Sequence, residues 1–228
     1  MVIITTKKGK AGETKFKFSQ STGFTQAINL YGLRNYTEDK VFDFFYSPSE
    51  DPGEDQSSRD AANAQVGLFS QARGSGNLVD YEKEIFGEKG LISITNVSMS
   101  GGSEKTRFFS GITHNNENGI VKGTGYEKTS LRINLEHRAS DFLKLSLSSN
   151  YIYSSSDRGF YNNDNTGTSI GVALVSTYPW YNLFPNADGI YPDYALGASN
   201  ILQTRDVVVN NEKINRVIMG GYGQSRYL

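Results

Sequence analysis

The residue types that most often carry chemistry are few in this chain and widely separated. The two histidines, His114 and His137, lie in segments that alternate between polar and apolar residues, as strands do. A zinc site or a nucleophile–base pair needs several such groups close together, and the sequence supplies no further ligand or nucleophile for either histidine. Cysteine is absent, which excludes thiolate chemistry and disulfide bonds. We therefore predict no metal site, no cofactor and no catalytic residue.

Four aspartates in loop-like sequence are the other candidates for chemistry: Asp157, Asp164, Asp188 and Asp193. A calcium loop of the D-x-[DN]-x-[DN]-G type does not occur, and no convergent carboxylate pair of the glycosidase kind can be identified. Aspartate is common in turns because its side chain hydrogen-bonds nearby backbone groups. Turn formation is the prediction for these four residues, and we predict that the protein is not an enzyme.

An aromatic and amide cluster near residue 180 is the strongest candidate for binding. Aromatic rings stack on sugar rings or peptide side chains, and amide groups exchange hydrogen bonds with hydroxyls, so a carbohydrate or peptide platform is predicted here. The competing interpretation is that the rings pack a long loop against itself. The predicted ligand-binding residues are Tyr178, Trp180, Tyr181, Asn182 and Tyr191.

Composition favours an all-β protein. Of 228 residues, 24 are glycine, 14 tyrosine and 13 phenylalanine, and this mixture is typical of strands joined by many turns. The net charge is −1, from 23 basic and 24 acidic residues, so we expect no nucleic-acid partner. No apolar run of about 18 residues occurs, which excludes a transmembrane helix. A transmembrane β-barrel is not excluded, because its strands have an alternating pattern.

Strict alternation marks two neighbouring segments as two-faced strands. Polar residues occupy the even-numbered positions: Arg132, Asn134, Glu136, Lys144, Ser146 and Ser148. Apolar residues occupy the odd-numbered positions: Leu131, Ile133, Leu135, Leu143, Leu145 and Leu147. Tyr151 and Tyr153 continue the apolar parity, where their amphipathic rings suit a membrane–water interface. Successive side chains point to opposite faces of a strand, so each segment has one apolar and one polar face.

The same pattern predicts an antiparallel meander with short turns at 101–105 and 139–142. In one strand Ile92 and Ile94 have the opposite parity to Val97 and Met99, and a β-bulge near Thr95–Asn96 would reconcile them. The predicted strands are 1–8, 14–27, 91–100, 106–116, 128–138, 142–155 and 206–228.

Residues 28–90 interrupt the strand pattern, and insertions of this length are usually functional or disordered. A helix is predicted from a Thr37 N-cap to Tyr46, because acidic residues follow the cap and apolar residues recur on one side. A second helix is predicted at Ser58–Ala72 and a third turn at Asp80–Phe86. The acidic, turn-rich segment 47–58 is predicted to be a mobile surface tip.

An ordered series of motifs resembles one known family. VIITTKKGKAG at residues 2–12 is similar to the end of the plug domain in SusC/RagA-type TonB-dependent receptors, the outer-membrane importers of Bacteroidetes. VDYEKEIF at 79–86 is similar to that family's TDWQDEIF, with Tyr81 in place of the usual tryptophan. Residues 98–156, which begin SMSGGSEKTRFF and include SLRINLEH, are similar to the family almost throughout. Residues 157–228 match only loosely.

The resemblance implies a fragment of such a receptor. Residues 1–10 would be the last plug strand and hinge, and 11–228 would be the first six or so strands of a barrel of about 22. Two long extracellular loops would occupy 28–90 and 157–205. We expect further chain on both sides, because Met1 stands where the family has a glycine and because the last strand lacks a partner. The apolar face of the two alternating segments, with Tyr151 and Tyr153, would then contact lipid, and their polar face would line the lumen.

The function implied by the resemblance is TonB-dependent import of glycan or peptide oligomers across the outer membrane. The implied partners are a SusD-like surface lipoprotein, TonB through the plug, and outer-membrane lipid. Two other classes stay open from the residues alone. One is a soluble all-β carbohydrate-binding or adhesion module, whose apolar face would be a sandwich core. The other is a surface glycoside hydrolase, which requires a carboxylate pair.

Overall fold

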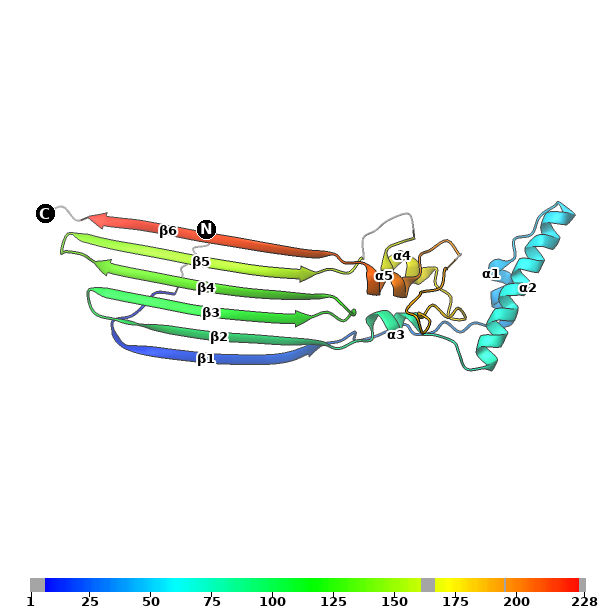
Figure 1. Cartoon of the computed structure of the whole chain (residues 1–228), viewed down its shortest axis with the longest axis horizontal. Coiled ribbons are helices and arrows are strands. Elements are labelled where there is room, and N and C mark those ends of the chain that lie inside the picture. The colour runs from blue at the N-terminus through cyan, green and yellow to red at the C-terminus, as the bar shows by residue number, and fades with distance from the viewer. Residues whose placement is uncertain (1–6, 161–166, 195, 226–228) are drawn as a thin grey trace.

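The computed structural model describes residues 7–160, 167–194 and 196–225, and its main feature is one open antiparallel sheet (Figure 1). Its six strands are β1 (Gly12–Thr25), β2 (Gly90–Gly102), β3 (Thr106–Asn118), β4 (Gly125–Arg138), β5 (Leu143–Asp157) and β6 (Asn211–Ser225). Each strand pairs with its neighbours in chain order, from β1 to β6. The predicted meander is confirmed. Most of the expected first strand at 1–8, and Asp164, lie outside the described residues.

Cross-strand register assembles an apolar band on one face of the sheet. Leu131 on β4 pairs with Tyr151 on β5 and with Ile112 on β3, and Leu135 pairs with Leu147. These side chains are not covered by any second layer, and their exposed fractions lie between 37% and 48%. A sandwich core would bury them almost completely. The other apolar members of the band include Phe16, Phe18, Val97, Met99, Ile133, Leu145, Val217 and Met219.

Toward the end that carries the long loop, the polarity of the two faces of β2 reverses between Val97 and Thr95. On the face of the apolar band, Thr95 pairs with His114, which pairs with Thr129 and binds its hydroxyl through Nδ1 at 2.9 Å. On the opposite face of β2 lie Ile92 and Ile94. The strand therefore passes from one environment to another along its length.

The predicted bulge near Thr95–Asn96 is wrong. β2 keeps a continuous register with β1 from Gly90 to Ser100 and with β3 from Ile92 to Gly102. The irregularity of the β1–β2 pair lies instead between Gly12 and Lys15. In β2 the apolar residues move along the chain from even-numbered to odd-numbered positions because the apolar side chains change faces along the strand. This change does not require the extra residue of a β-bulge.

Within the described residues, five helices form a cap at the end of the sheet where the β1–β2 and β5–β6 connections lie (Figure 1). They are α1 (Glu38–Phe45), α2 (Pro52–Gly74), α3 (Tyr81–Phe86), α4 (Ile170–Val175) and α5 (Ile201–Val207). The short β3–β4 turn reaches the same end, and its Val121 is 5% exposed within the cap. Within the described part of the chain, no helix is long and apolar enough to cross a membrane.

Local capping explains where the helices begin. The predicted Thr37 cap is confirmed: its hydroxyl accepts a hydrogen bond from the Lys40 amide. The predicted mobile tip is wrong, because α2 begins inside it. Asp51 accepts hydrogen bonds from two amides of the first turn, and Pro52 occupies the first turn, where its missing amide costs nothing. Asn200 caps α5 in the same way. This helix occupies the end of the predicted loop and the first two residues of the strand predicted at 206–228, which begins only at Asn211.

The buried apolar side chains of the described residues lie in this cap and its turn rather than on the strands. A larger cluster includes Tyr81, Ile85, Ile170, Leu183, Ile201 and Leu202. A smaller one consists of Val41, Phe69, Ala72 and Trp180. The cap is therefore held together by burial, whereas the sheet depends on backbone pairing.

The described N-terminal segment lies on the polar face of the sheet. Asn134, which is 5% exposed, donates a hydrogen bond from Nδ2 to the Lys7 carbonyl at 2.5 Å. Lys8 Nζ lies 2.6 Å from Glu136 Oε1, whose second oxygen is 3.3 Å from Lys144 Nζ. These partly exposed ion pairs each contribute on the order of 0.2–1 kcal/mol, so the segment is held by several weak contacts.

Close packing of Gly9 against β3 generates a prediction about this segment. A Cβ at residue 9 would overlap the backbone of Phe108, so Gly9→Ala should displace the segment and weaken its neighbouring contacts. We expect trypsin to cleave faster after the three lysines of the segment. Ala11→Ser, at an exposed position, is the control and should leave the cleavage rate unchanged. Equal rates for both variants would show that the segment does not depend on this contact.

The two environments along β4 generate a second prediction. Ile133→Arg places a charge in the middle of the apolar band and should cost about 2–4 kcal/mol if that band contacts hydrocarbon. Glu127→Arg lies on the same face of the same strand, beyond the band, and should cost about 0–1 kcal/mol. Urea titration of the protein folded into phospholipid vesicles measures both. Equal costs would contradict lipid contact at the band.

Candidate ligand site in the helical cap

The aromatic residues predicted to bind ligand lie at the seam between the two long connections. Tyr178 stacks on Trp180 with ring centroids 5.0 Å apart and meets Phe45 of α1 edge-on, also at 5.0 Å. Trp180 is only 6% exposed, and its Nε1 donates to Gln65 Oε1 of α2 at 3.1 Å. The rings of Tyr178 and Trp180 therefore join the 157–210 connection to α1 and α2.

The other three predicted residues also make contacts within the cap. Tyr181 exchanges hydrogen bonds with Gln65, at 2.9 and 3.1 Å. Tyr191 donates to Asp206 Oδ2 at 2.8 Å. Asn182 is exposed, and its Oδ1 accepts from the Phe184 amide at 3.2 Å. Whether any of the five contacts a ligand stays a prediction.

Asp206 is the centre of a charged network beside Tyr191. Arg205 donates two hydrogen bonds of 2.9 Å to its carboxylate, and Lys122 Nζ lies 3.3 Å away. Burial alone would raise the pKa of Asp206, but the hydrogen bonds from Arg205 and Tyr191 outweigh it and hold the pKa at about 2. At neutral pH the Asp206 carboxylate is therefore ionised, and both of its oxygens are engaged by Arg205, Tyr191 and Lys122. A carboxylate bound in this way is better suited to holding these segments together than to catalysis.

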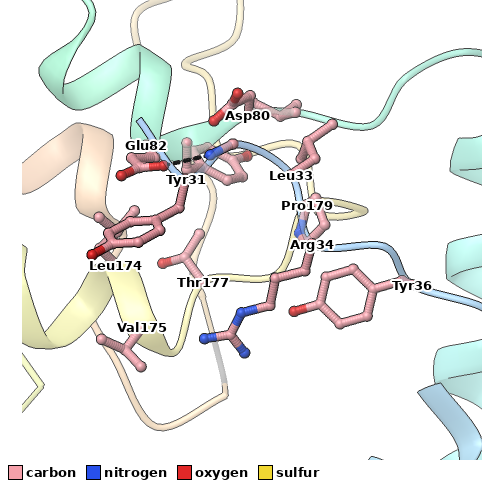
Figure 2. Close-up of a pocket in the computed structure, with 13 residues that line it drawn as sticks. Tyr31, Leu33, Arg34, Tyr36, Asp80, Glu82, Leu174, Val175, Thr177 and Pro179 are labelled. Carbon is pink, nitrogen blue, oxygen red and sulfur yellow. Dashed lines mark hydrogen bonds between the residues drawn. The ribbon is translucent and has the colours of Figure 1, made fainter. Parts of the chain in front are cut away.

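A cavity of about 460 Å³ opens next to the aromatic seam, and Thr177 and Pro179 belong to its lining (Figure 2). Three separate stretches of chain build it: residues 31–36 before α1, residues 79–82 at the start of α3, and residues 174–179, which begin in the last turn of α4. Its volume falls in the range of about 300–1,000 Å³ that is typical of small-molecule sites.

Backbone contacts hold the three stretches in place. Gly32, with a φ of 72° in the left-handed region that favours glycine, donates its amide hydrogen bond to Glu82 Oε2 at 2.8 Å. The Val79 amide donates to the Pro179 carbonyl at 2.8 Å. Because these bonds connect residues far apart in sequence, the cavity exists only in the folded cap.

Tyr81 forms part of the cavity wall and links it to the core. Its hydroxyl donates to the Tyr181 carbonyl at 2.5 Å and accepts from the Leu183 amide at 3.0 Å. Burial raises the pKa of Tyr81 to about 12, so the hydroxyl stays a donor at neutral pH. A tryptophan at this position could donate but not accept.

The five ligand-binding residues predicted from the sequence lie beside the cavity, but none of them belongs to its lining. Tyr31 and Arg34 belong to a segment without any periodic pattern, so no local signal marks them, whereas Glu82 lies in the predicted turn at Asp80–Phe86. Among the described residues, no group of three or more His, Cys, Asp or Glu side chains could hold a metal ion. The cavity instead presents aromatic, apolar and charged side chains, which suit reversible binding.

The fold and the cap together define a class of protein. The sheet has one apolar face with no covering layer and one polar face that holds the chain's own N-terminal segment. Short turns lie at one end of the strands, and two long connections at the other. These features are typical of the wall of an outer-membrane β-barrel with extended outer loops.

Comparisons with known proteins agree with this class. Over 95 residues the chain is 36% identical to TonB-dependent receptor P26 of Formosa agariphila, and over 147 residues it is 28% identical to TonB-dependent receptor P39 of the same organism. Solved structures of the RagAB peptide transporter, and of the RagAB peptide importer in a closed-closed state, match 98% of the chain with TM-scores of 0.68 at 20% and 18% identity. No protein-family model matches the chain.

The chain spans only part of each relative: the alignments cover 9% and 13% of the two receptors and 27% of the solved chains. Within that span, the chain is similar in sequence to TonB-dependent receptors and shares the fold of the matched part of the RagAB chains. The resemblance stated from the sequence is confirmed, and so is the outer-membrane location. The matched proteins are named as receptors and transporters, not as enzymes.

The Tyr81 hydroxyl generates a prediction about the cap. Tyr81→Phe leaves the Leu183 amide without its acceptor and should lower the free energy of unfolding by about 1–3 kcal/mol. Guanidinium denaturation followed by the fluorescence of Trp180, the one tryptophan of the chain, measures the change. Tyr31→Phe, at a fully exposed ring, is the matched control and should change stability by less than about 0.5 kcal/mol. Equal effects would contradict the structural role of the Tyr81 hydroxyl.

Proposed function

We propose that this chain forms part of the barrel wall and the extracellular cap of a TonB-dependent importer of nutrient oligomers. The observation that carries the proposal is the two-faced sheet, with an uncovered apolar band on one face and the N-terminal segment bound to the other. In this arrangement residues 11–228 supply wall and loops, and residues 1–10 supply the last plug strand and the hinge.

Under this proposal the apolar band faces lipid. Leu131, Ile133, Leu135, Leu145, Leu147 and Tyr151 are exposed on one face of β4 and β5. Leu143 and Tyr153, which are half-buried, share that face. The hydroxyl- and amide-rich stretch beyond the band would then stand outside the membrane, so that the bilayer covers only part of the strand length.

The hinge contacts fit a plug that must both stay in place and move. The segment at residues 7–9 is bound by one buried amide, by Lys8–Glu136 and by close packing of Gly9. Contacts of this size can be broken by a mechanical pull on the plug and formed again afterwards. The substrate is translocated unchanged, so the protein is a transporter and not an enzyme.

The proposed partners are TonB, acting through the plug, and a SusD-like surface lipoprotein. The solved neighbours are named RagAB peptide importers, which supports a two-protein assembly and an oligomeric cargo. Glycan or peptide oligomers are the proposed substrates. The long helix α2 lies at the far end of the cap from the sheet and runs across the strand direction (Figure 1), and it offers exposed polar surface to such a partner.

Uptake in living cells tests the proposal. We expect the complete receptor in the outer-membrane fraction, and we expect cells to lose uptake of a fluorescently labelled glycan or peptide oligomer when either the receptor gene or TonB is deleted. Uptake of a monosaccharide that crosses general porins is the control and should not change. Uptake that persists without TonB, or a protein that stays soluble and monomeric without detergent, would contradict the proposal and favour a soluble binding module.

A further inference from the structure

The cavity in the cap carries charges of opposite sign at its two ends. Figure 2 shows the guanidinium group of Arg34 at one edge of the cavity, and Asp80 and Glu82 toward the opposite edge. Arg34 is exposed, and within the described part of the chain its side chain has no hydrogen bond or ion pair. The structure therefore leaves a planar, five-donor cation facing the cavity without an acceptor.

The acidic end is held in place by backbone contacts. Asp80 Oδ1 accepts from the Lys83 amide at 3.0 Å, and Glu82 Oε2 accepts from the Gly32 amide at 2.8 Å. Each carboxylate keeps a second oxygen that no hydrogen bond of the described residues occupies. These positions are fixed without neutralising the two negative charges.

Between the charged ends, the lining is largely apolar or aromatic. Val175 is 66% exposed, Leu33 46% and Tyr31 100%, while Leu174 and Tyr36 are half-buried. When a ligand covers large exposed apolar side chains around a cavity, its binding becomes more favourable by about 25 cal/mol for each Å² of apolar surface buried. A ligand that fits must carry an anion, an apolar middle and a cation.

We propose that this cavity binds a short peptide with free termini, as a cargo or capture subsite of the importer proposed above. The terminal carboxylate would take a forked pair of hydrogen bonds from Arg34, a geometry that guanidinium groups match closely. The terminal ammonium would lie at Asp80 and Glu82, and an apolar side chain would cover Val175 and Leu33. This inference rests on the proposed function for its biological setting but on the cavity alone for its chemistry.

Charge complementarity favours a peptide over a glycan. A neutral sugar would bury one end against Arg34 without supplying an anion. A uronate oligomer would satisfy Arg34 but bring further negative charge toward Asp80 and Glu82, where like charges repel. Only a zwitterionic ligand pairs both ends, and short peptides are the oligomers that carry this charge pattern.

Calorimetric titration of the detergent-purified receptor with tri-leucine tests the proposal. We expect binding of tri-leucine to weaken by about tenfold or more when its carboxylate is amidated or when Arg34→Gln is introduced. The two changes should not add, because both remove the same contact. N-acetylation of tri-leucine and the double change Asp80→Asn with Glu82→Gln should behave as a second non-additive pair. Asn and Gln keep the backbone hydrogen bonds at these positions.

Two controls separate this site from general effects. Arg73→Gln removes an exposed arginine outside the cavity and should leave the affinity unchanged, whereas Arg34→Lys should keep part of it. Tighter binding of tri-galacturonate than of tri-leucine, additive losses, or no tri-leucine binding would overturn the peptide subsite. TonB-dependent uptake in the same cells would still stand in those cases, so the failure of this inference is distinguishable from failure of the proposed function.

Discussion

Backbone hydrogen bonding is the constraint on which the rest of this structure depends. In hydrocarbon an unpaired amide or carbonyl costs several kcal/mol, so a strand at the membrane must pair along its whole length. The meander pairs each strand with the next in nearly unbroken register, so that among the described strands only the outer edges of β1 and β6 have no partner strand in this sheet. The register also decides which side chains share a face. Because pairing satisfies the backbone, the sheet needs no buried core, and its apolar side chains stay available to lipid.

The cap is held together by a different balance of forces. Its loops lie beyond the apolar band, and short helices in water are stable only when they bury an apolar face. Tyr178 and Trp180 join the two long connections, and Tyr81 connects α3 to the irregular segment at 181–183. Tyr178, Trp180 and Tyr81 therefore stabilise the cap through contacts with other parts of the chain. The ligand-sized space lies beside the cluster.

Local patterns predicted the strands well and the helices in part. The period-two pattern placed the four strands from β2 to β5 within about three residues of their observed ends, because the face of a strand is set by its own residues. The start of α2 was wrong because Asp51 and Pro52 appeared as turn residues, although both also favour the first turn of a helix. The bulge predicted at Thr95 was wrong because the apolar side chains of β2 change from one face of the sheet to the other while the register continues unbroken.

The sequence by itself determined the two-faced strands, the meander and the family, since these depend on residue order and alternation along neighbouring segments. Only the tertiary structure decided that Asn134 and Glu136 hold the N-terminal segment and that Arg34 lies across a cavity from Asp80. Such contacts join residues more than forty positions apart, and their geometry follows from how loops of irregular sequence pack. No periodicity encodes that packing, because loop conformation is set by the surfaces that the loops meet.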